Sequence, residues 1–174
     1  MAGSRAALDA TLRALVRRTF RFDAAPPELL ALGAPALARL LDAPDSVFFD
    51  DEMDWRDYGG NRRQALAAFA EADLARVLAA IKRRKWPDAR VVLSGVGLVR
   101  DARLVPVLAR AYAGGDPLTR AAAVEQLGGQ RHPLATATVE RALRDRSSDV
   151  RRAATRALAQ LKQPKNRARN SSED

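Results

Sequence analysis

From residue 88 onward the chain repeats itself at a spacing of 31 residues, and this repeat constrains its fold more than any other feature. Segments that begin at residues 88, 119 and 150 carry the same residue types at matching positions. Each segment is expected to form a helix, a turn that contains glycine, and a second helix. No such helix pair can bury its apolar stripe alone, so successive pairs must stack. The matching positions are Val96, Leu127 and Leu158; Val92, Ala123 and Ala154; Leu108 and Val139; and the glycines Gly97 and Gly128.

Composition agrees with an all-helical chain. Alanine supplies 36 of the 174 residues, and aromatic residues only 5%. Alanine is the best helix former and a poor strand former, so this composition favours closely packed helices over sheets. The chain has no cysteine and one histidine, which excludes disulfides, thiolate metal sites, cysteine nucleophiles and paired-histidine metal sites. We predict no metal and no cofactor.

The first half of the chain predicts helices without the clear repeat. Apolar periodicity indicates a helix over 5–21. A short pair is expected over 27–32 and 35–42. A second pair is expected over 62–70 and 72–85. Between these pairs, residues 43–60 predict an irregular stretch that combines acidic and aromatic side chains.

We therefore predict a single helical domain over residues 1–161. Its repeats are clear over 88–161, and its helix pairs are degenerate over 5–87. Residues 162–174 are polar and basic and have no apolar face, so they predict a disordered tail. No apolar run approaches the length of a membrane span, and the N-terminus lacks the apolar core of a secretory signal. These observations predict a cytoplasmic bacterial protein.

The repeat pattern resembles the HEAT repeat, in the short form found in bacterial and phycobilin-lyase-like chains. The resemblance covers residues 88–161. It implies an all-α, right-handed helical-repeat solenoid of armadillo-like type, whose second helices line the concave face and which usually serves binding. The residues that carry it are Asp116-Pro117, Thr119-Arg120, Ala121–Ala123, Leu127-Gly128, Asp149–Ala154 and Ala157-Leu158.

Four arginines fall on or near the predicted second helices. Arg110 and Arg141 are 31 residues apart, so they should lie side by side, with Arg103 and Arg144 near the helix ends. Arginine binds carboxylates and phosphates through paired hydrogen bonds, so these residues predict a binding ridge. The alternative is a solvated helix face on which Glu140 pairs with Arg144. A GC-rich coding bias would also account for many arginines.

Two further arginines recur in the first helices of the repeats. Arg120 and Arg151 occupy a position at which HEAT-like units often carry arginine, and the resemblance implies a ladder of ion pairs between repeats. Asp116 and Asp149 are the candidate acceptors. The single histidine, His132, precedes Pro133 and predicts a surface or helix-capping residue rather than a catalyst.

The acidic stretch from Asp50 to Asp57 is the main carboxylate cluster. Trp55 stands where the turn of an EF-hand loop needs glycine, so that kind of calcium site is excluded. Trp55 and the nearby Tyr58 are of the residue type that anchors protein interfaces. We therefore include both with the arginine ridge as candidate binding residues.

These features favour a non-enzymatic protein-binding module whose partner has an acidic surface. An adaptor, a chaperone-like subunit and a toxin-neutralising immunity protein all stay open. The alternative partner is nucleic acid, bound through the same ridge with the basic run Lys82–Lys85 and the tail. A distant third is an enzyme similar to the helical-repeat DNA glycosylases, for which no catalytic residue can be assigned. The sequence predicts no membrane partner and gives no oligomeric state.

Overall fold

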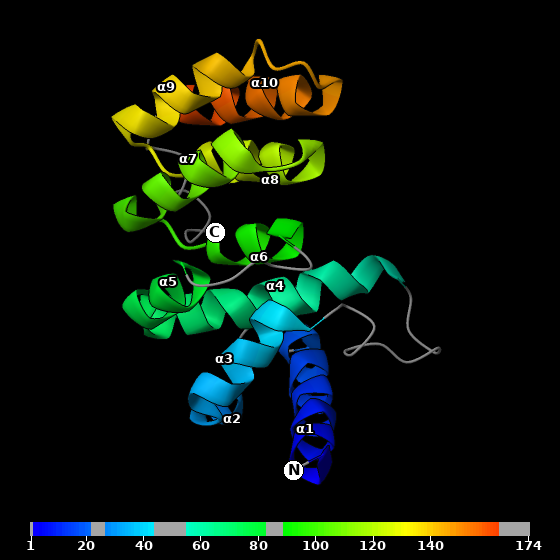
Figure 1. The fold of residues 1–174 in the computed structure, drawn as a ribbon. Helices are drawn as coiled ribbons and strands as arrows, with labels where there is room; N and C mark the ends of the chain where they lie inside the picture. Colours follow the sequence, from blue (N-terminus) through cyan, green and yellow to red (C-terminus); the bar gives the residue numbers. More distant parts are fainter. Residues whose placement is uncertain (1, 22–26, 44–54, 83–88, 164–174) are drawn as a thin grey trace, which may run out of the picture. The chain divides into compact units, whose positions relative to one another are not determined.

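The computed structural model describes the backbone over residues 2–21, 27–43, 55–82 and 89–163. Side chains are described over residues 5–16, 27–43, 62–82 and 89–163. Within these ranges every regular element is a helix, which confirms the predicted all-α helical-repeat class (Figure 1). The chain divides into two compact units, Met1–Arg100 and Asp101–Asp174, which we call the first and the second unit.

The first unit is organised around one long helix, α4, which contacts each of the other five. Along the chain, the first unit begins with one helix, continues with a short helix pair, and ends with α4 and two further helices. Leu12, Leu40, Leu66, Ile81 and Leu93 are fully or almost fully buried between these helices. The helices are α1 (Ala2–Arg21), α2 (Pro27–Ala31), α3 (Gly33–Asp42), α4 (Trp55–Ala72), α5 (Leu74–Lys82) and α6 (Ala89–Val96).

Close backbone packing and polar contacts hold the first unit together. A Cβ atom at Gly95 of α6 would lie 2.8 Å from Cβ of Leu66 in α4, so this glycine lets the two helices approach. The Arg39 side chain binds both carboxylate oxygens of Asp9, at 2.7 and 2.8 Å, and thereby ties α3 to α1. This hydrogen-bonded pair lowers the pKa of Asp9.

The second unit consists of two layers of helices. The first helices of the repeats, α8 and α10, pack against each other, and the second helices, α7 and α9, form the neighbouring layer (Figure 1). Their apolar columns are buried as the spacing of 31 predicts: Leu127, Ala123, Ala154, Leu108 and Val139 are all fully buried. The elements are η2 (Ala102–Leu104), α7 (Val105–Gly114), α8 (Pro117–Leu127), α9 (Pro133–Ala142) and α10 (Ser148–Lys162).

Several helix boundaries differ from those predicted from the sequence. The irregular stretch expected over 43–60 is shorter, because α4 already begins at Trp55. A break at Asp73 separates α4 from α5, and the described part of α5 runs over Leu74–Lys82. Lys162, expected to open the tail, is the last residue of α10. Residues 44–54, 83–88 and 164–174 lie outside the described residues.

Gly128 shows why the turn between the repeat helices needs glycine. Its φ of −57° is open to any residue, so the requirement is one of space. An added Cβ would lie 2.6 Å from Oε1 of Gln160 and 2.7 Å from Cα of Ala157, both on α10. The helices α8 and α10 can therefore approach closely only because this side chain is absent.

We expect Gly128→Ala to destabilise the second unit by about 1–3 kcal/mol, because the methyl group would push α8 away from α10. Urea denaturation followed by circular dichroism measures the loss. Gly129→Ala is the matched control, since its Cβ would meet nothing closer than 3.6 Å. Equal losses in the two variants would contradict the role given to Gly128.

Candidate binding site on the second-helix face

Two of the predicted ridge arginines lie as the repeat spacing requires. Arg110 is exposed on α7 and Arg141 is exposed on α9, and these two helices contact each other. Arg144 is also exposed, but it lies in the turn after α9 rather than on the helix. Arg103 lies in η2, just before α7.

Arg141 has a defined partner that the sequence did not indicate. Its guanidinium carbon lies 5.1 Å from the centre of the Tyr112 ring, a cation–π arrangement between α9 and α7. The tyrosine is 8% exposed, whereas the arginine is exposed. The guanidinium carbon lies over the ring, and the guanidinium N–H groups are the donors that carboxylates and phosphates bind.

Beside this pair the surface is hollowed. The hollow has a volume of about 460 Å³ and collects residues from the end of α7, the start of α8, the end of α9 and the turn that follows α9. We call it the Tyr112 hollow. It is lined by Tyr112, Ala113, Arg120, Arg141, Asp145 and Arg146.

A nearly buried ion pair lies within the lining of the hollow. The Nε and Nη2 atoms of Arg120 donate to the two carboxylate oxygens of Asp145, at 3.0 and 2.8 Å, and the two side chains are only 9% and 8% exposed. The same carboxylate accepts from the backbone N–H of Ser147 at 2.9 Å. The hydrogen bond from Arg120 is the main reason that the pKa of Asp145 lies below its usual value, although burial acts in the opposite direction.

Of the expected ladder of ion pairs, Arg120 forms one, Arg151 binds backbone carbonyls instead, and the predicted acceptors Asp116 and Asp149 are wrong. Asp116 accepts from the backbone N–H of Thr119 at 2.8 Å and caps α8, while Asp149 pairs with Arg152 on α10. Both carboxylates are thus engaged close to their own position in sequence. Arg120 instead crosses to Asp145 in the turn before α10.

A hydrogen bond to a turn carbonyl recurs at this position of the repeat. Nη1 of Arg120 donates to the carbonyl oxygen of Gly115, and Nη1 of Arg151 donates to that of Arg146, both at 3.1 Å. Each arginine therefore reaches the carbonyl five residues before it. Arg151 also donates to the carbonyl oxygen of Asp145 at 2.9 Å, which ties the same turn to α10.

Arg103 is not part of the hollow. Its Nε and Nη2 atoms bind the carboxylate of Asp101, two residues earlier, at 3.0 and 2.8 Å. These contacts, with a hydrogen bond from the backbone N–H of Arg103, lower the pKa of Asp101 to about 2. The predicted alternative for the ridge, an ion pair between Glu140 and Arg144, does not form among the described residues.

The remaining predicted positions are placed as follows. Trp55 and Tyr58 lie in α4 of the first unit, and their side chains lie outside the described ones, so their role as anchors stays a prediction.

His132 caps α9, its Nδ1 accepting from the backbone N–H of Leu134 at 3.1 Å, which confirms the capping role. The described side chains include no cluster that could hold a metal ion.

We expect Asp145→Asn to lower the free energy of unfolding of the second unit several times more than Asp149→Asn does. The first change leaves the nearly buried Arg120 guanidinium without its counter-charge, whereas the second removes an exposed pair of small value. Urea denaturation of the full chain measures both. Similar losses would show that the Arg120–Asp145 pair does not hold the turn.

Lowering the pH should remove the stabilisation that the Asp145 carboxylate provides. The pKa of Asp145 is depressed in the folded protein, so its stabilising effect is complete above the ordinary value of 3.8 and is lost as the pH falls through the lower folded value. The stability gap between the wild type and Asp145→Asn should therefore be large at about pH 6 and shrink at about pH 3. A gap that is unchanged between these pH values would contradict the assignment.

Comparison with known proteins agrees with the repeat seen in the sequence and in the helices. A family model described as HEAT repeats matches residues 103–169, which lie in the second unit. No curated protein and no solved structure is significantly similar to the chain. Among the described residues, no helix has the length and apolar character needed to cross a membrane. HEAT repeats generally serve as scaffolds for protein interactions, and the match supports a HEAT-repeat assignment for residues 103–169.

Proposed function

We propose that this chain is a non-enzymatic protein-binding module that takes an acidic segment of a partner protein at the Tyr112 hollow. The observation that carries the proposal is the stacking of Arg141 on Tyr112 beside the hollow. Tyrosine and arginine are among the residue types enriched at the energetic hot spots of protein interfaces. Adaptor, chaperone-like and immunity roles in the cytoplasm all fit such a module.

The charge of the lining supports an acidic partner. Three arginines and one aspartate line the hollow, and Arg120 and Asp145 neutralise each other within it. Arg141 and Arg146 therefore give the hollow its net positive charge. An incoming carboxylate could bind Arg141 through two parallel hydrogen bonds, and the cation–π contact with Tyr112 would restrain the arginine side chain beforehand.

The surroundings of the hollow favour close approach of a polypeptide. Pro106 and Ala113 on α7 and Ala137 on α9 are exposed and small, and none carries a charge. A partner segment could therefore lie across both second helices while one acidic side chain enters the hollow. A volume of about 460 Å³ suits such a side chain with its neighbours.

The chemistry of the hollow supports binding rather than catalysis. Among the described residues that line it, Asp145 is the only carboxylate, and the ion pair with Arg120 keeps that group deprotonated and lowers its basicity. A general acid or base works best with a pKa near the operating pH, and the pKa of Asp145 is shifted away from it. HEAT repeats are also typically non-catalytic.

We expect Arg110→Glu with Arg141→Glu to abolish partner binding, since the double change reverses the charge of the second-helix face. The measurement is a pull-down with the tagged full chain from native lysate, with and without nuclease. Arg152→Glu with Arg156→Glu, an equal charge change on α10, is the matched control. Circular dichroism should show unchanged helix content in both variants.

The supporting result is a stoichiometric protein that survives nuclease, persists with the α10 control and is lost with the Arg110 and Arg141 variant. Retention of that protein by the Arg110 and Arg141 variant would overturn the assignment of the face. Loss of all co-purifying material on nuclease treatment would instead favour the alternative partner, nucleic acid. Absence of that nucleic acid from the Arg110 and Arg141 variant, with retention by the α10 control, would assign it to this ridge.

A further inference from the structure

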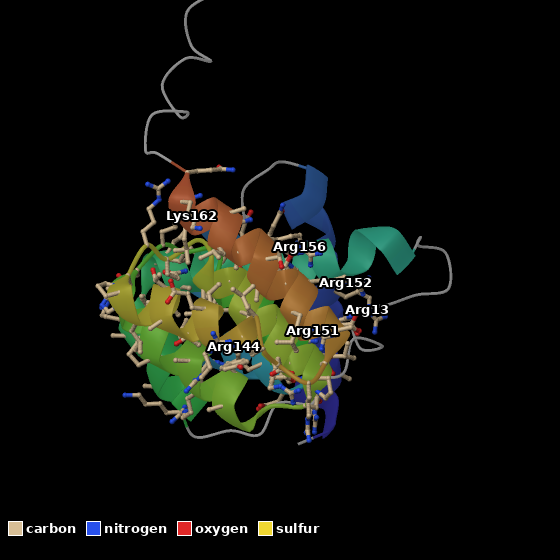
Figure 2. The ribbon with its side chains drawn as sticks, turned by 90° about the horizontal axis from the view of Figure 1, so that it is seen from above. Arg13, Arg144, Arg151, Arg152, Arg156 and Lys162 are labelled. Atoms are coloured by element: carbon tan, nitrogen blue, oxygen red, sulfur yellow. The ribbon has the colours of Figure 1, made fainter. Side chains whose placement is uncertain are left out.

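We infer that the outer face of α10 is a second binding surface, which takes the phosphate backbone of a nucleic acid without regard to sequence. Figure 2 shows its cations along the helix, from Arg151 and Arg152 near its start, through Arg156, to Lys162 at its end. We call these four residues the α10 basic face. The face is carried by a different helix from those that carry Arg110 and Arg141, so it does not rest on the proposed protein-binding site.

Helical periodicity puts the key cations on the solvent side. The side chains that α10 buries are Val150, Ala153, Ala154 and Ala157, which face the helices α8 and α9 that it contacts. Arg152 and Arg156 lie one turn apart on the exposed side, and their side chains are 72% and 62% exposed. Within the described residues α10 is the last helix, and no later described helix covers this side.

The face has an excess of positive charge. Its four cations share α10 with one acidic residue, Asp149, which pairs with Arg152. Arg156 lies 3.9 Å from a carboxylate oxygen of Glu125 on α8. Ion pairs that are this exposed are worth little, so a phosphate oxygen can replace either carboxylate at small cost. Arg144, exposed in the turn between α9 and α10, adds a further cation (Figure 2).

The other exposed residues of α10 indicate which kind of partner this face can bind. Thr155, Ala159 and Gln160 are exposed there, and none is aromatic or large and apolar. A protein interface lacks its usual anchors on such a surface, and a helix at a membrane surface lacks the apolar face that enters the lipid. Contacts to phosphate oxygens need only positioned cations and hydrogen-bond donors, which this face supplies.

The test uses the full chain and a fluorescently labelled DNA duplex of random sequence. Anisotropy gives the binding constant at several salt concentrations between about 50 and 200 mM. We expect the logarithm of the binding constant to fall linearly with the logarithm of the salt concentration. Arg152→Gln with Arg156→Gln should reduce that slope by about 1.8, because each phosphate contact contributes about 0.9.

Arg110→Gln with Arg141→Gln is the matched control and should leave the slope nearly unchanged. Absence of duplex binding at about 50 mM salt would overturn the inference. An equal change of slope in the two variants would also overturn it, because binding would not be confined to α10. Vesicles of phosphatidylserine and phosphatidylcholine that bind through Arg152 and Arg156, when the duplex does not, would assign the face to a membrane instead. The protein partner is tested by a different readout, so loss of duplex binding in Arg152→Gln with Arg156→Gln would leave the proposed protein-binding site unaffected.

Discussion

The second unit depends on the ion pair between the nearly buried guanidinium of Arg120 and the carboxylate of Asp145. The Arg120 side chain extends from α8 to the carboxylate of Asp145, which lies in the turn before α10. It also donates to the carbonyl oxygen of Gly115, which lies in the turn before α8. One side chain thus links two successive inter-repeat turns. The α9–α10 turn carries Asp145 and Arg146 into the Tyr112 hollow, so the pair that holds the repeats in register also shapes the candidate site. Packing and binding geometry are therefore set together.

The repeat helices could be predicted because their positions depend on periodicity alone. Each repeat helix buries the residues on its inner side, as Leu127, Ala123 and Ala154 show. Gly128 marks the turn after α8, where the backbone packs closely against α10. The acceptor of Arg120 could not be found in this way. Asp145 matches Gly114 one repeat earlier, so no acidic column exists there for an alignment to show. The pair is visible only when the turn is placed in three dimensions.

The candidate site was predictable to a similar degree. A spacing of 31 was enough to put Arg110 and Arg141 on adjacent helices. The contribution of Tyr112 was not predicted, because it shares a column with Leu143 and reads as an ordinary core residue. Its stacking with Arg141 depends on side-chain conformation, which spacing does not encode. Arg103 was grouped with the ridge by position, but Asp101 lies two residues away and binds it locally, as often happens where a helical turn begins.

The polar outer side of α10 also limits how such an array can lengthen. A repeat unit is stable only when it shares an apolar surface with its neighbour. The inner side of α10 supplies that surface through Val150, Ala153 and Ala157, whereas its outer side offers Arg152, Thr155 and Arg156. A duplicated unit added after α10 would have no apolar surface to pack on. A unit inserted before α10 would find the apolar surface that it needs, whereas a unit packed directly on the outer side of α10 would not.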